Sequence, residues 1–207
     1  MAGDSAAHWQ RIYAEHQVGS LSWIEEAPGT SLELIAEAGL WSDAAVIDVG
    51  GGASRLAAAL VERDYSDVTV ADISSAALDR ARADLGESAR RVAWVESDVR
   101  HHDFGRRFDL WHDRAAFHFM VDAASRDDYL AVLGRSLKPG GHLILATFGP
   151  EGPTECSGLS VDRYDAAKIS RTLGADFALI SSRFVEHRTP SGRTQQFIYA
   201  HMRHQPG

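Results

Sequence analysis

The stretch that predicts most about the fold is residues 45–54, which read AVIDVGGGAS. Its first five residues are short, largely β-branched and apolar, which is typical of a buried strand. Glycines occupy 50–52, and a helical pattern follows over 55–62. Glycines permit positive φ angles and let a ligand approach the main chain where a Cβ would block it. We therefore predict a strand, a glycine-rich turn and a helix, an arrangement that several nucleotide-binding folds share.

Apolar runs and helical patterns alternate after this stretch. Further strands are predicted at 68–72, 92–95, 108–112 and 142–147, and helices at 76–85 and 126–137. Strands that alternate with helices through short connections form a parallel sheet covered on both faces. Residues 177–187 and 195–201 flank a turn at 189–192 and predict a terminal antiparallel hairpin. Such a hairpin distinguishes the sheet from the symmetric sheet of dinucleotide-binding folds.

The length of 207 residues suits one α/β domain over 1–207, with an N-terminal helical arm at 1–40 and a core at 41–207. No apolar run approaches the roughly 20 residues of a membrane span, so no membrane partner is expected. The N-terminus shows no signal-peptide pattern, which favours a cytoplasmic protein. The net charge of −8 makes nucleic acid a poor partner. The single cysteine, Cys156, excludes an internal disulfide and a multi-cysteine zinc site, and no metal is expected.

Carboxylates follow the second and third predicted strands. Asp72 ends the second strand about 20 residues after the glycines, where an acidic side chain accepts hydrogen bonds from ribose hydroxyls. Asp98 follows the third strand, where a carboxylate accepts a hydrogen bond from an adenine amino group. Open α/β sheets bind ligands at the carboxyl ends of their strands, so these features are expected to line one site.

In this combination the sequence resembles the class I S-adenosylmethionine (SAM) dependent methyltransferases. The resemblance runs in order over about residues 45–148. Its motifs are 48–54 (motif I, with Ser54 in place of the last glycine), Asp72 (II), Asp98-Val99 (III), 108–114 (IV) and 137–141 before strand five. It implies a Rossmann-like, seven-stranded methyltransferase sheet with a terminal antiparallel hairpin. The rival cofactor, a nicotinamide dinucleotide, would require its last fingerprint glycine at Arg55, a bulky residue.

The resemblance implies SAM as cofactor and S-adenosylhomocysteine as product. The implied cofactor-binding residues are Trp23, Asp48, Gly50, Gly51, Gly52, Asp72, Ile73, Asp98, Val99 and His112. By this resemblance Gly50 and Gly52 lie against methionine and ribose, and Asp48 reaches the amino group of SAM. Asp72 then holds the ribose, and Asp98 with the Val99 backbone binds adenine.

The loop after strand four carries the candidate catalytic residues. His112 or Asp113 would orient or deprotonate the acceptor. Arg114 would hold an anionic acceptor or the SAM carboxylate; the alternative is a local ion pair with Asp113. For His118 we favour packing under the sheet.

Two substrate residues are expected after strand five. Cys156 would contact the acceptor, or serve as a small buried hydrophobe. Tyr164 would line the same pocket, or pack beside the start of a helix.

Aromatic residues in the N-terminal arm form a second candidate. Trp9 and Trp23 would cover the cofactor, since ring faces attract a cationic sulfonium, or would only anchor the arm. The Trp…Tyr…Trp pattern resembles thiopurine-type methyltransferases and protein-lysine methyltransferases. Residues 111–119 also resemble a signature of small bacterial methyltransferases, Trp-His-Asp-Arg-Ala-x-Phe-His-Phe.

The sequence thus predicts a SAM-dependent methyltransferase with a small-molecule N, O or S acceptor. This choice rests on the absence of an added recognition domain and of a basic stripe in the sequence. A protein acceptor, as in a protein-lysine methyltransferase, is the alternative. A non-catalytic SAM-binding protein is the third.

Overall fold

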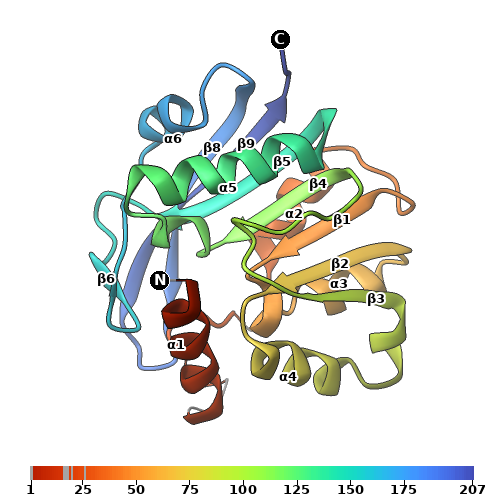
Figure 1. Ribbon diagram of the computed structural model, residues 1–207, viewed down its shortest axis with the longest axis vertical. Coiled ribbons are helices and arrows are strands. Elements are labelled where there is room, and N and C mark those ends of the chain that lie inside the picture. Colours follow the sequence, from red (N-terminus) through yellow and green to blue (C-terminus); the bar gives the residue numbers. More distant parts are fainter. Residues whose placement is uncertain (1, 16–18, 20, 26) are drawn as a thin grey trace.

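A computed structural model of the chain describes residues 2–15, 19, 21–25 and 27–207 (Figure 1). Residues 1, 16–18, 20 and 26, which belong to the predicted N-terminal arm, lie outside this description. Within the described residues, seven strands form the main sheet in the order β3-β2-β1-β4-β5-β9-β8. They are β1 (Ala45–Val49), β2 (Asp67–Asp72), β3 (Val92–Glu96), β4 (Phe108–Arg114), β5 (Leu137–Phe148), β8 (Phe177–Arg188) and β9 (Thr194–His204).

The first five strands are parallel, and β9 and β8 close the sheet as an antiparallel hairpin. Strand β1 lies at the centre of the parallel part, between β2 and β4. All five residues of β1 are buried, as expected for a strand covered on both faces. The predicted Rossmann-like sheet with its terminal hairpin is confirmed.

Helices cover both faces of the sheet. They are α2 (Gly29–Glu37), α3 (Leu56–Glu62), α4 (Ser75–Leu85), α5 (Ala123–Ser136) and α6 (Ala166–Leu173), whereas α1 (Ala2–Glu15) lies off the two faces. One core cluster joins the sheet to α5 and α6, and a second joins it to α2, α3 and α4. Successive strand residues alternate between the clusters, with Val46 in one and Ile47 in the other. Among the described helices, none is long and apolar enough to cross a membrane.

Helix α1 and a small two-stranded sheet lie at the carboxyl ends of the parallel strands (Figure 1). The small sheet consists of β6 (Glu155–Cys156) and β7 (Leu159–Ser160). The Gln10 side chain of α1 accepts hydrogen bonds from the hydroxyls of Ser74 and Ser75 and from the Ala76 N–H. These groups lie at the first turn of α4, so α1 is held at the edge of the sheet where ligands are expected.

Several elements extend beyond their predicted bounds. Helix α5 begins at Ala123 rather than at residue 126, because the Asp122 side chain caps it by accepting a hydrogen bond from the Ser125 N–H. Strand β5 begins at Leu137 rather than at residue 142, because Leu137 already pairs with Phe108 of β4 before the register shifts.

Candidate functional site

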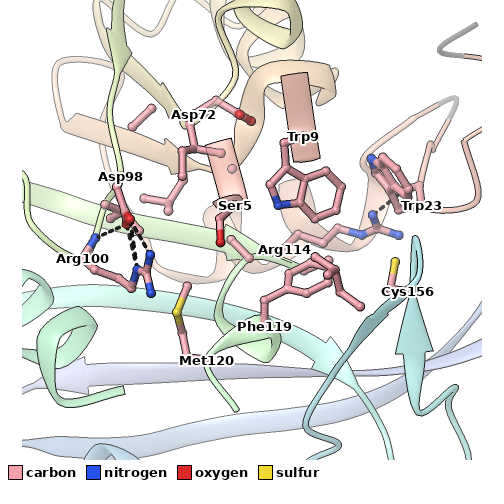
Figure 2. A pocket seen from close by; sticks show the side chains of 18 of the residues that line it. Ser5, Trp9, Trp23, Asp72, Asp98, Arg100, Arg114, Phe119, Met120 and Cys156 are labelled. Atoms are coloured by element: carbon pink, nitrogen blue, oxygen red, sulfur yellow. Dashed lines mark hydrogen bonds and ion pairs between the residues drawn. The ribbon is translucent and has the colours of Figure 1, made fainter. Parts of the chain in front are cut away.

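A cavity of about 320 Å³ lies at the carboxyl ends of the central strands, a volume typical of small-molecule pockets. Helix α1 and the β6–β7 sheet contribute to its walls. The predicted site residues that line it are Trp23, Gly50, Asp72, Ile73, Asp98, Val99, Arg114 and Cys156. Figure 2 shows Asp98 and Arg100 at one end of this cavity and Arg114, Trp23 and Cys156 at the other.

The glycine loop permits close packing at the floor of the cavity. Gly50 has φ +67°, and a Cβ built there would lie 2.9 Å from the Cβ of Ala116. A Cβ on Gly52 would lie 2.5 Å from the Cβ of Ala77 and 2.8 Å from Asp72 Oδ2. Only glycine fits these positions without displacing a neighbour. Gly50 also lines the cavity, whereas the predicted residues Gly51 and Gly52 do not.

Asp72 is buried and still lines the cavity. Its Oδ2 accepts a hydrogen bond from the Gly52 N–H at 3.0 Å, and its Oδ1 accepts one from the Ser74 N–H at 2.9 Å. Burial raises the pKa of Asp72 to about 6, against the opposing effect of these hydrogen bonds. At neutral pH the side chain is a carboxylate with lone pairs left for a ligand.

Asp98 and Arg100 form a polar pair at the end of the cavity opposite Trp23 and Cys156. Arg100 is not among the residues predicted from the sequence. The Arg100 Nε donates to Asp98 Oδ1 at 2.9 Å, and the Arg100 backbone N–H donates to the same oxygen. Burial acts to raise the pKa of Asp98, but the Arg100 hydrogen bonds outweigh it and lower the pKa overall. The spacing of two residues between an acid and an arginine was the available signal for this pair.

His112 lies beneath the cavity and does not line it. Its Nδ1 is 2.7 Å from Asp48 Oδ1 and its Nε2 is 2.9 Å from Ser31 Oγ on α2. The imidazole therefore ties β1 to α2 through both ring nitrogens. Gly51 is likewise buried, and a Cβ on it would collide with the Asp48 carboxylate.

Asp113 is fully buried and also lies outside the cavity. Its Oδ1 accepts hydrogen bonds from the N–H groups of Ala116 and Phe117, and its Oδ2 accepts one from the Tyr129 hydroxyl at 2.6 Å. Burial raises the pKa of Asp113 to about 6, opposed by these hydrogen bonds. The carboxylate fixes the turn after β4 and does not line the cavity.

Arg114 lies between the main cavity and a second, smaller cavity. Its Nε lies 3.2 Å from Glu25 Oε2 and 2.9 Å from the Tyr199 hydroxyl, and its Nη1 donates to the Trp23 carbonyl at 2.7 Å. The ion pair is thus with Glu25. A small cavity of about 40 Å³ is lined by Arg114 and Asp48. Among the described residues, neither Arg114 Nη2 nor Asp48 Oδ2 has a hydrogen-bond partner, although both atoms are buried.

Aromatic rings from the N-terminal arm meet the loop after β4. The Trp9 ring packs edge-on against Phe119 at 5.1 Å and against Trp23 at 5.8 Å between centroids. Tyr13 lies 6.2 Å from Trp23. All four rings line the cavity. These contacts anchor the arm, and the same rings line the cavity, where a role in covering the cofactor stays a prediction.

The remaining predicted residues divide between cavity and core. Cys156 lines the cavity, and burial raises the pKa of its thiol. Tyr164 is buried outside the cavity, 5.7 Å from the ring of Phe117. His118 packs on Phe148 at 4.7 Å, and burial lowers its pKa to about 3, so it is a neutral core residue.

Some lining residues were missed by the sequence analysis. They are Ser5, Arg100, Met120, Val121, Leu159 and Ser160. Met120 and Val121 directly follow the signature at residues 111–119, so a longer stretch would have included them. Ser5 gave no local signal, because only the docking of α1 brings it to the site.

Comparisons with known proteins agree with this architecture. Residues 46–141 match the methyltransferase domain family. The chain is 35% identical to the ubiquinone/menaquinone biosynthesis C-methyltransferase UbiE of Paracoccus denitrificans over 107 residues. This aligned segment covers 50% of this chain and 42% of that protein. The chain therefore spans less than half the length of this curated relative.

Solved structures resemble nearly the whole chain. A SAM-dependent methyltransferase from Anabaena variabilis has a TM-score of 0.75 at 16% identity, covering 97% of this chain and 95% of that one. The 1,6-didemethyltoxoflavin-N1-methyltransferase of Burkholderia thailandensis, solved with 1,6-didemethyltoxoflavin and S-adenosylhomocysteine, has a TM-score of 0.72 at 20% identity, covering 100% and 91%. The chain thus has the Rossmann-like fold of class I methyltransferases, and the predicted fold class is confirmed.

Proposed function

We propose that this chain is a SAM-dependent methyltransferase that acts on a small-molecule acceptor. The observation that carries the proposal is that Gly50 of the glycine loop, Asp72 and Asp98 line one cavity at the carboxyl edge of the sheet. The match of residues 46–141 to the methyltransferase domain family supports the reaction class. The small-molecule acceptor named for the Burkholderia thailandensis enzyme supports the acceptor class.

The cavity suits the adenosine part of SAM. Gly50 lines the cavity without a side chain, which would let the main chain contact the cofactor, and the Gly52 N–H donates to the Asp72 carboxylate. The Asp72 carboxylate, which lines the cavity, would accept hydrogen bonds from the ribose hydroxyls. Asp98, already oriented by Arg100, and the backbone at Val99 would hold the adenine.

The small cavity beside the glycine loop suits the amino acid end of SAM. Asp48 Oδ2 is an unpaired acceptor and Arg114 Nη2 an unpaired donor, and both residues line this cavity. An ammonium and a carboxylate on one carbon are the complementary groups. We therefore assign Arg114 to the cofactor carboxylate, one of its two predicted roles, and Asp48 to the amino group.

When bound, SAM supplies a methyl group on a sulfonium that is already activated for displacement. The chain then has to hold the acceptor in line and exclude water, which accounts for a site without an acid–base pair. We assign positioning roles to His112 and Asp113: the first fixes the Asp48 carboxylate, and the second fixes the turn that carries Ala116.

The test combines binding and transfer. Calorimetry with SAM and with S-adenosylhomocysteine measures affinity for the cofactor, and absence of binding would reject the proposal. Methyl-labelled SAM is then incubated with the protein and a cell extract separated into small molecules and macromolecules. Label in small molecules supports the proposal, whereas label in a protein band supports a protein-lysine methyltransferase. Binding without transfer to either fraction supports the non-catalytic alternative.

A further inference from the structure

The end of the cavity away from Asp98 is lined mainly by aromatic and apolar side chains. This inference rests on the proposed function and concerns the chemical class of the methyl acceptor. The described side chains there are mainly aromatic or apolar, among them Trp9, Trp23, Phe119 and Leu159. Figure 2 shows Trp9 and Phe119 in the middle of the site, with Trp23 and Cys156 beyond them. Flat apolar molecules gain most from such a lining, because stacked or edge-on rings add to the burial of apolar area.

This end offers no proton acceptor among the described lining residues. Its titratable groups are Tyr13, Cys156 and Arg114. Burial raises the pKa of the Tyr13 hydroxyl, with a further contribution from the negative charge of Asp72, and burial raises the pKa of the Cys156 thiol. Both groups therefore remain protonated at neutral pH, and the Arg114 guanidinium is a permanent cation paired with Glu25.

The other candidate bases near the cavity are engaged, and Glu25 is held in its ion pair with Arg114. Asp98 is held by Arg100, and Asp72 accepts hydrogen bonds from the backbone at the cofactor end. His112 and Asp113 lie outside the cavity with their polar atoms engaged. An acceptor that must lose a proton, such as an aliphatic ammonium or an alcohol, therefore finds no described group to take it.

We propose that the acceptor is a planar nitrogen heterocycle, uncharged at neutral pH and methylated on a ring nitrogen with a free lone pair. The lone pair forms the nitrogen–carbon bond while the carbon–sulfur bond breaks and its electron pair stays on sulfur. No proton leaves, and the positive charge ends on the heterocycle. The rings of Trp9, Trp23 and Phe119 favour this charge, because a cation is attracted to an aromatic face.

An anionic acceptor fits this end less well. Arg114 is the described cation at this end, it is paired with Glu25, and its remaining donor is assigned to the cofactor carboxylate. Burying a carboxylate or phenolate among aromatic rings without a free cation is costly. The two acceptor classes thus predict opposite charge preferences for ligands of one shape.

The experiment uses isosteric probes on the full chain saturated with S-adenosylhomocysteine. N-methylquinolinium and 1-methylnaphthalene have the same shape and differ in charge, and 1-naphthoate supplies an anion of similar size. Equilibrium dialysis measures their affinities. We expect N-methylquinolinium to bind about threefold to thirtyfold more tightly than 1-methylnaphthalene, the ratio expected of a cation–π contact, and 1-naphthoate to bind most weakly.

Equal affinity for the two isosteres, or tightest binding of 1-naphthoate, would overturn the inference. S-adenosylhomocysteine affinity is measured first in the same preparation. Failure of that binding rejects the proposed function, whereas cofactor binding with the wrong probe order rejects only the acceptor class.

A matched pair of variants locates the effect. Trp9→Leu removes one of the three rings and is expected to lower the affinity ratio of the two isosteres, and a ratio that stays at the wild-type value would reject the role of the Trp9 ring. Trp41→Leu is the control, because Trp41 is 82% exposed and outside the cavity, and it should leave the ratio unchanged. If Trp9→Leu does not fold, Phe119→Leu gives the same test, and the wild-type ratio is decisive without either.

Discussion

The carboxylates of Asp72 and Asp113 differ in what lies beside them, although their burial is alike. Each ends or nearly ends a parallel strand, each accepts two backbone hydrogen bonds, and burial raises the pKa of each to about 6. Asp72 keeps one side on the cavity, whereas Asp113 is enclosed and receives the Tyr129 hydroxyl. A raised pKa of an aspartate therefore indicates burial in this fold. Contact of the carboxylate with the cavity is what distinguishes the candidate ligand-binding residue.

The largest effect is expected from a substitution at Asp113, which should affect stability and not ligand affinity. Asp113→Ala leaves the Ala116 and Phe117 N–H groups and the Tyr129 hydroxyl without their acceptor in the core. We expect the free energy of unfolding to fall by about 3 kcal/mol, since each buried unpaired group costs on the order of 1 kcal/mol or more. Urea unfolding followed by circular dichroism measures the change.

The control for this variant separates stability from chemistry. SAM affinity of folded Asp113→Ala should stay within about threefold of wild type, a change below 1 kcal/mol. A variant that keeps wild-type stability but loses methyl transfer would show instead that Asp113 takes part in the reaction.

At Asp72 the expected loss is in ligand affinity. Asp72→Ala removes the acceptor proposed for the ribose hydroxyls, and SAM affinity should fall by about 1–3 kcal/mol, measured by calorimetry. Stability should change by about 1 kcal/mol or less, because water in the cavity can hydrogen-bond the Gly52 and Ser74 N–H groups. Asp79→Ala, at an exposed position on α4, is the matched control and should leave affinity unchanged. Wild-type affinity in a folded Asp72→Ala protein would reject the ribose assignment.

The difference between these two aspartates also explains what the sequence predicts. That Gly50, Asp72 and Asp98 line one cavity was predictable, because parallel topology brings the carboxyl ends of consecutive strands to one edge. A glycine loop and an acid at the next strand end are local signals, and each lies where the strand stops. The fold followed from the same alternation of strands and helices.

His112, Asp113 and Tyr164 were not predictable to the same degree. Whether a polar residue at a strand end faces a ligand depends on its partners, and these come from distant parts of the chain. Ser31 reaches His112 across 81 residues, and Tyr129 reaches Asp113 from α5. Sequence spacing carries no information on such pairings, so the motif after β4 looked catalytic although its acid is enclosed.

The pH dependence of SAM affinity distinguishes the role of Asp72 from that of Asp113. Only the ionised Asp72 offers all its lone pairs to the ribose, and its pKa is about 6. We expect affinity to rise about tenfold between pH 5 and pH 7, one unit below and one above that pKa. Calorimetry at both pH values measures the rise. Asp72→Asn should abolish it, and Asp113→Asn should retain it; a rise that survives in Asp72→Asn would assign it to another group.

The raised pKa of the enclosed Asp113 should make the free energy of unfolding depend on pH. Its pKa of about 6 in the folded chain exceeds the ordinary value of 3.8, so the folded state binds more protons between these values. Its contribution to the free energy of unfolding is complete below about pH 4 and is lost as the pH rises through about 6. Asp113→Asn should therefore gain stability relative to wild type over this interval.

The smallest effect is expected where α1 is held over the site. The Gln10 side chain accepts three hydrogen bonds from the first turn of α4, and Trp9 and Tyr13 of the same helix line the cavity. Gln10→Ala should weaken this docking by about 0.5–1 kcal/mol, because the hydrogen bonds from Ser75 and Ala76 are exposed and water can replace the acceptor there. Hydrogen exchange of the α1 amides should then be about threefold faster, and SAM affinity lower by a similar factor. Gln10→Glu keeps the acceptor and places a negative charge at the N-terminus of α4, where the helix dipole favours it, so wild-type protection is expected. Equal protection in Gln10→Ala and wild type would mean that the aromatic cluster alone holds α1 against the cavity.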